Sequence, residues 1–169
     1  MLIKIGKNTS SFSTYSCQPK TRDELERIIK SRIDKKGPNC DLNDIDTSLI
    51  TDMDGLFIDT QFNGDISKWN VSNVKRMSYM FYWSHFNGDI SKWNTSNVIY
   101  MTSMFYRSKF NQPIGDWDVS NVKSMNCMFY DSEFNKDISN WKLLEYCDTN
   151  LMFSGCPIKE KYKPKSLQV

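Results

Sequence analysis

The sequence predicts an α/β solenoid of about five coils, each 24 residues long, with a capping helix at its N-terminal end. Three observations predict this fold. Large apolar residues recur with a period of 24. Within each repeat, the apolar spacing changes from alternating to helical. An amphipathic segment precedes the first repeat.

The period is clearest in the tryptophans, which stand 24 residues apart: Trp69, Trp93, Trp117 and Trp141. The segment FNGDISKWNVSNVKRMSYMF at 62–81 returns at 86–105 and, more altered, at 110–129. Diverged copies at both ends extend the array over residues 38–157. A 24-residue unit cannot bury its own Phe and Trp, so like units must stack. We therefore predict one repeat domain over 38–157.

Each repeat contains two patterns of apolar residues. Around Ile66 the polar and apolar residues alternate, which predicts one short strand per coil. Farther on, Val74, Met77 and Phe81 are spaced three and four residues apart, which predicts a short helix or helical turn. Ser72 is suited to be the N-cap of that helix.

Two sets of asparagines also keep the period. In stacked coils, the side-chain amide of each asparagine lies close enough to form hydrogen bonds with the backbone of the adjacent coil. Both sets therefore predict ladders of polar contacts at the turns. The members are Asn63, Asn87, Asn111 and Asn135 in one set, and Asn73, Asn97 and Asn121 in the other.

The segment 19–37 predicts an amphipathic helix. Thr21 and Glu24 form a capping-box pattern, and Gly37 is suited to the C-cap. The apolar face consists of Leu25, Ile28, Ile29 and Ile33. We expect this helix to cover the open end of the core, with a partner-binding helix as the alternative. Residues 1–6 are suited to an edge strand. The predicted organisation is an N-terminal strand and cap over 1–37, the repeats over 38–157 and a basic tail over 158–169.

The unit at 62–81 resembles the repeats of the BspA-like leucine-rich-repeat family of bacteria, and the lead-in from residue 21 to residue 57 also looks like that of many members. The resemblance implies a right-handed leucine-rich-repeat-like solenoid that binds proteins, of bacterial or phage origin. Many members resemble exported adhesins. Here the first 17 residues contain neither a signal-peptide core nor a lipobox, and the five cysteines lack paired spacing. We therefore expect a cytoplasmic protein.

No pattern indicates catalysis, so we expect a non-enzyme without metal or cofactor. His85 is the only histidine. Nucleophilic pairing of His85 with Cys127 or Cys147 stays open, as does zinc binding by His85, Cys147 and Cys156, although close ligand pairs are lacking. The recurring acidic residues Asp65, Asp89 and Asp137 raise calcium binding as an alternative to a solvated edge.

The near-zero net charge of +2 conceals a strong asymmetry. Residues 1–37 carry nine basic and four acidic side chains, whereas residues 38–158 carry nine basic and fifteen acidic ones. Residues 159–169 add four lysines and one glutamate. An acidic repeat domain argues against nucleic-acid binding on its face, which needs clustered Lys and Arg. It suits a basic partner, a mimic of a phosphate backbone, or simply an ordinary solvated surface.

Positions that vary between repeats indicate where a partner binds, and several hold residue types that are common at interface hot spots. Tyr82 and Tyr106 instead stand at a position that is tyrosine in three repeats, which indicates an exposed ladder, with packing between coils as the alternative. The candidate partner-binding residues are Tyr82, Trp83, Tyr100, Tyr106 and Arg107. The leading hypothesis is a non-catalytic protein–protein interaction module. The alternative is an inhibitor encoded by a phage or mobile element, which blocks a host nucleic-acid enzyme such as a CRISPR effector by stoichiometric binding. Neither hypothesis requires a membrane, and the oligomeric state is left open.

Overall fold

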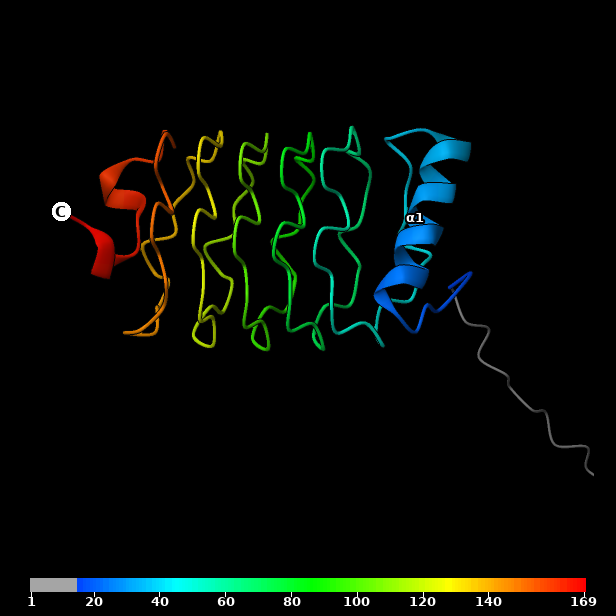
Figure 1. Cartoon of the computed structure of the whole chain (residues 1–169), viewed down its shortest axis with the longest axis horizontal. Coiled ribbons are helices and arrows are strands. Elements are labelled where there is room, and N and C mark those ends of the chain that lie inside the picture. Colours follow the sequence, from blue (N-terminus) through cyan, green and yellow to red (C-terminus); the bar gives the residue numbers. More distant parts are fainter. Residues whose placement is uncertain (1–14) are drawn as a thin grey trace, which may run out of the picture.

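The computed structural model describes residues 15–169, which form a column of stacked coils with a helix at one end (Figure 1). The helix α1 spans Arg22–Lys36. Near the other end lie two 3-10 helices, η1 at Glu160–Tyr162 and η2 at Lys165–Leu167. The edge strand predicted at residues 1–6 lies outside the described residues.

The prediction of an α/β, leucine-rich-repeat-like solenoid is wrong. Within residues 15–169 the only α-helix is α1, and no strand or sheet forms. Where strands were expected, the coils contain turns: Trp69 N–H donates to the Ile66 carbonyl three residues back, at 3.1 Å. Contact between coils produces only isolated parallel bridges, for example between Arg76 and Tyr100.

The predicted helix within each repeat is absent because alternate peptide groups bond in different directions. The N–H groups of Met80, Tyr82 and Ser84 donate three residues back, within their own coil. The intervening donors bond to carbonyls of the next coil: Met77 to Tyr100, Tyr79 to Thr102, Phe81 to Met104 and Trp83 to Tyr106. An α-helix would use all these N–H groups internally and leave none to bind the neighbouring coil. The same pattern recurs at every interface from residue 53 to residue 154.

The core between the two sides of each coil is built from columns of identical side chains. Phe81, Phe105 and Phe129 are fully buried, and their rings stack at 5.5 and 5.6 Å. Trp69, Trp93 and Trp117 stack at 6.5 Å. Each Trp Nε1–H, including that of Trp141, donates to the carbonyl 27 residues earlier. Stacking thus both buries the rings and satisfies their single donor.

Both asparagine ladders are confirmed. Each backbone N–H of Asn87, Asn111 and Asn135 donates to the Oδ1 of the asparagine one coil earlier, at 2.8 to 2.9 Å. In the second ladder, the Nδ2 of Asn97 donates to the Ser72 carbonyl at 2.7 Å.

The helix α1 is confirmed, and it covers the N-terminal end of the column (Figure 1). Thr21 accepts the N–H of Glu24 as N-cap, and Gly37 ends the helix with φ of 84°. Leu25 and Ile29 are buried in the same core as the coils. Burying this face removes the end of the core from water, as expected for a cap.

Candidate functional site

One side of the column is formed by a turn segment that repeats in register, as residues 76–83 in one coil and 100–107 in the next. Two positions of this segment adopt a left-handed backbone in every coil. The first holds Gly55, Tyr79, Ser103, Cys127 and Leu151, and the second holds Asp59, Trp83, Arg107, Asp131 and Gly155. The left-handed conformation is therefore a property of the fold, independent of the residue present.

The residues at these positions are unusual for that backbone. Glycine, which adopts positive φ without steric cost, stands there only at Gly55 in the first coil and Gly155 in the last. Tyr79 and Trp83 have φ of 59° and 55°. For a side chain of that size such values are rare and cost about 1–2 kcal/mol. Both side chains are nevertheless exposed, by 43% and 47%.

Aromatic rings and a guanidinium lie in direct contact over this segment. The rings of Tyr82 and Tyr106 stack at 4.7 Å, and the column continues to Tyr130 at 4.9 Å. The guanidinium of Arg107 lies 5.3 Å from the centre of the Trp83 ring and 5.5 Å from that of Tyr106. Asp131 holds this guanidinium through an ion pair of 3.2 Å. These contacts fix the orientation of side chains that stay accessible to solvent.

Two ionisable groups in this cluster keep their ordinary charge at neutral pH. Desolvation raises the pKa of the Tyr106 phenol, which stays neutral. The hydrogen bond to Asp131 raises the pKa of Arg107, which stays charged. The surface therefore combines neutral aromatic rings with an oriented cation.

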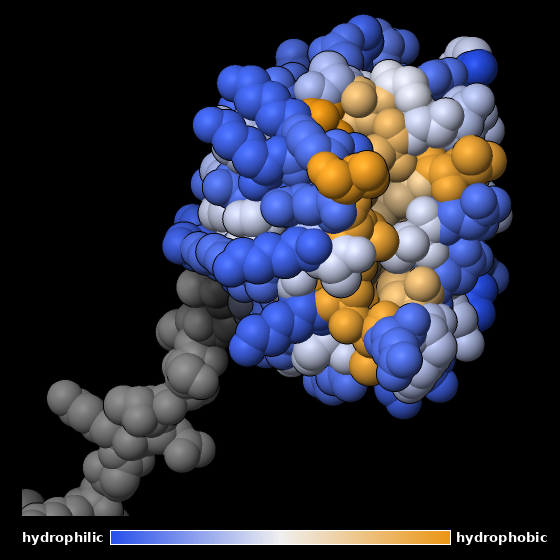
Figure 2. Space-filling view, turned by 90° about the vertical axis from the view of Figure 1, so that its left-hand side faces the viewer, coloured by the Kyte–Doolittle hydropathy of each residue, from blue (hydrophilic) through white to orange (hydrophobic). Residues whose placement is uncertain are grey.

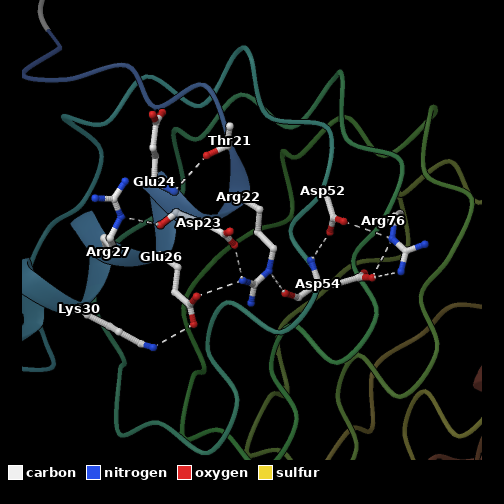
Figure 3. Close-up of polar contacts among 10 residues, drawn as sticks. All are labelled: Thr21, Arg22, Asp23, Glu24, Glu26, Arg27, Lys30, Asp52, Asp54 and Arg76. Atoms are coloured by element: carbon white, nitrogen blue, oxygen red, sulfur yellow. Dashed lines mark hydrogen bonds and ion pairs between the residues drawn. The ribbon is translucent and has the colours of Figure 1, made fainter.

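A second pair lies nearer to α1. Arg76 lies 5.8 Å from the centre of the Tyr100 ring and forms ion pairs with Asp52 and Asp54. Figure 3 shows that these contacts continue to the helix, because Arg22 donates to the backbone carbonyl of Asp54. The cap and the first two coils are thus linked by one chain of polar contacts at the edge of the aromatic surface. We call Tyr79, Tyr82, Trp83, Tyr100, Tyr106 and Arg107 the aromatic face.

Comparison with models of protein families places the chain in one of them. The model of a family described as "Mycoplasma protein of unknown function, DUF285" matches residues 28–109 and again residues 82–163. The chain belongs to the DUF285 family. Neither a curated protein nor a solved structure matches it. Among its described residues, no helix is long and apolar enough to cross a membrane.

In this DUF285 protein, the structure brings four of the five predicted site residues together: Tyr82, Trp83, Tyr106 and Arg107. Tyr100 contacts Arg76 instead. Sequence reasoning missed Tyr79, whose ring lies 5.9 Å from that of Tyr82. The signal was present, because Gly55 in the first copy aligns with Tyr79 and indicates a left-handed position.

The residues considered for catalysis and metal binding are not members of the aromatic face. His85 is exposed, and its repeat equivalents Lys109 and Glu133 form an ion pair. Burial raises the pKa of the thiols of Cys127 and Cys147, which disfavours the nucleophilic thiolate. Among residues 15–169, no three His, Cys, Asp or Glu side chains are grouped to hold a metal ion.

The recurring aspartates have a structural part in the turns. The carboxylates of Asp65, Asp89 and Asp137 each accept the backbone N–H two residues later, at 2.9 Å. This is the Asx-turn contact, in which a short polar side chain takes the place of a backbone acceptor.

Proposed function

We propose that this DUF285 protein is a non-catalytic protein–protein interaction module that binds its partner through the aromatic face. One observation carries the proposal: Tyr79 and Trp83 occupy exposed positions at which the backbone favours glycine. Bulky residues held in sparsely populated backbone conformations concentrate at functional sites.

These side chains contact neighbours on the surface and lie outside the buried core. Trp83 is 47% exposed and Tyr100 is 40% exposed, whereas the core tryptophans are buried. Exposed aromatic residues and arginine that are already oriented by contacts lose little rotamer freedom on binding, which favours affinity. The proposal includes a cytoplasmic location, which the five unpaired thiols support.

The test uses the variant Trp83→Gly, because glycine relieves the left-handed backbone while it removes the ring. Immobilised wild-type protein is compared with Trp83→Gly, Arg107→Ala and the control Lys109→Ala, whose side chain forms an exposed ion pair outside the aromatic face. We expect a protein from a bacterial lysate that is retained by the wild type and the control, and at least tenfold less by the two aromatic-face variants. Equal retention by Trp83→Gly would contradict the proposal.

A narrower form of the proposal concerns the kind of partner. The acidic repeat domain, with fifteen acidic and nine basic residues over 38–158, suits a partner that normally binds nucleic acid. If the retained partner is a nucleic-acid enzyme, the purified protein should inhibit it at a one-to-one ratio, and Trp83→Gly should not. Full enzyme activity at saturating protein would exclude inhibition while leaving the binding function intact.

A further inference from the structure

The last complete coil presents a row of backbone donors at the C-terminal end of the column. At the preceding interface, Met125, Cys127, Phe129 and Asp131 donate their N–H groups to carbonyls of this coil. Its own equivalent N–H groups have no acceptor among residues 15–169; they belong to Thr149, Leu151, Phe153 and Gly155. We call these four residues the donor edge.

The carbonyl groups at this edge are already occupied. Those of Asp148, Asn150, Met152 and Ser154 accept from the preceding coil. The carbonyls of Thr149, Leu151 and Phe153 accept from N–H groups three residues later in the same coil. The donor edge therefore presents N–H groups, so a segment that binds there must supply hydrogen-bond acceptors.

The C-terminal segment covers a different part of the last coil. Lys159 N–H donates to the Oδ1 of Asn135, and the carbonyl of Tyr162 accepts the N–H of Ile138. These contacts place residues 158–162 over the first half of the coil. Farther on, Lys163 Nζ lies 5.8 Å from the centre of the Phe153 ring, and Leu167 lines a groove with Thr149. Among the described residues, none of this segment accepts a hydrogen bond from the donor edge.

Apolar surface lies beside the donor edge. Figure 2 faces this end of the column and shows a band of hydrophobic residues between hydrophilic borders. Leu151 is 51% exposed. A groove of about 250 Å³ is lined partly by Leu143, Leu144 and Leu167. At the edge of a β-sheet, unpaired backbone groups next to apolar surface bind the main chain of a peptide. The donor edge offers the same two features on a row of turns.

We propose that the donor edge binds a segment of a partner protein that adopts the turn conformation of residues 100–107. This segment supplies backbone carbonyls at alternate residues and apolar side chains for the adjoining band. The acceptor spacing is the one found inside the column, where Tyr100, Thr102, Met104 and Tyr106 accept the equivalent row. A second copy does not fit the edge, since two rows of donors cannot pair. The carbonyl-bearing end of a second copy is covered by α1, where Arg22 donates to the Asp54 carbonyl.

The probe is a synthetic peptide with the sequence of residues 98–109. Within the chain, carbonyl groups of this segment accept the equivalent row of N–H groups from the preceding coil. Binding is followed by amide chemical shifts and hydrogen exchange of the full-length protein. We expect changes at Leu151, Phe153 and Gly155, with no changes for a peptide of scrambled sequence. Leu151→Asp should weaken peptide binding at least fivefold, whereas Leu49→Asp, at a residue 48% exposed in the first coil, should not.

Three results would overturn the proposal. The peptide shifts no amide of the donor edge. The four amides exchange as slowly in the free protein as those of Met125, Cys127, Phe129 and Asp131, which means that the chain itself covers them. Their protection rises with protein concentration in the absence of peptide, which means that a second copy covers them. Trp83→Gly should leave peptide binding unchanged, so the outcome is independent of the aromatic face.

Discussion

The side-chain Oδ1 of Asn87 accepts the backbone N–H of Asn111 at 2.8 Å, and the N–H of Asn87 donates in turn to Asn63. Asn87→Ala removes the acceptor and leaves the Asn111 N–H without its partner. We expect a loss of about 1 kcal/mol in the free energy of unfolding, measured in urea. Asn87→Asp keeps an acceptor oxygen at the same place, so its loss should be smaller. Equal losses for the two variants would show that the ladder bond contributes nothing.

Replacement by Gly and by Val should have opposite orders of stability at a left-handed position and at its neighbour. Asp59 is exposed and has φ of 50°, whereas the adjacent Ile58 is 47% exposed and lies outside the left-handed set. At Asp59, replacement by Gly should give a more stable protein than replacement by Val, by about 1 kcal/mol or more, because a β-branched side chain is strained there.

At Ile58 the order should reverse, because Gly there gains backbone freedom in the unfolded state and loses side-chain contact. Urea unfolding of the four variants measures both differences. If the Gly and Val variants have the same order of stability at both residues, the backbone at Asp59 is not strained.

The tryptophan column should be sensitive to loss of a single donor. Trp93→Phe preserves an aromatic ring between Trp69 and Trp117 but removes the 3.2 Å hydrogen bond to the Ile66 carbonyl, which then keeps only the bond from Trp69 N–H. Because a buried hydrogen bond and part of the ring volume are both lost, we expect a loss of about 2 kcal/mol in the free energy of unfolding. The matched control is Tyr106→Phe, which keeps the stacked ring and removes only a hydroxyl that makes no hydrogen bond with residues 15–169. Its loss should be under about 0.5 kcal/mol.

The Asx turns predict that the stability of the protein depends on pH in the acidic range. Hydrogen bonds from Ser91, Ser120 and Ser139 lower the pKa of Asp89, Asp118 and Asp137, respectively. A carboxyl whose pKa is lower in the folded state contributes stability above its unfolded pKa, about 3.9, and loses it as the pH falls through the folded pKa. The urea midpoint should therefore be steady from pH 7 to about pH 5 and fall below about pH 4.

Asp118 allows a test of whether the Asx turns cause this fall in stability at low pH. Asn94, one coil earlier, makes the equivalent contact to Ser96 N–H without titrating. Asp118→Asn should therefore keep the turn at neutral pH and reduce the fall in stability at low pH. If Asp118→Asn loses as much stability at low pH as the wild type, the pH dependence comes from other carboxylates. One of these is Asp44, whose pKa is lowered by its hydrogen bond from Ser16 and by Arg32.

The periodic features of the fold were readable from the sequence, and the backbone conformation was not. The recurrence of Trp69 and Asn63 predicts which side chains stack, because stacked coils bring equal positions together. The spacing of Val74, Met77 and Phe81 misleads, since successive turns place apolar residues three and four apart just as a helix does. Distinguishing the two requires knowing that alternate N–H groups bond to the next coil, which side-chain periodicity does not encode.

The same limit applies to the candidate site. Variation between repeats was sufficient to select Trp83 and Arg107, which lie in contact. It did not show that Trp83 stands on a left-handed backbone, because glycine occurs at these positions only in the diverged end copies. At Trp83 itself, the left-handed backbone is seen only in the three-dimensional structure.

The identical contacts between successive coils also bear on how such a chain changes over generations. An inserted or lost segment of 24 residues, or of a multiple of 24, would leave the columns and hydrogen bonds between coils in register, whereas any other length would misalign all coils beyond it. Gene length should therefore vary among relatives in whole coils. Each added copy would lengthen the aromatic face by one row without altering the rows already present.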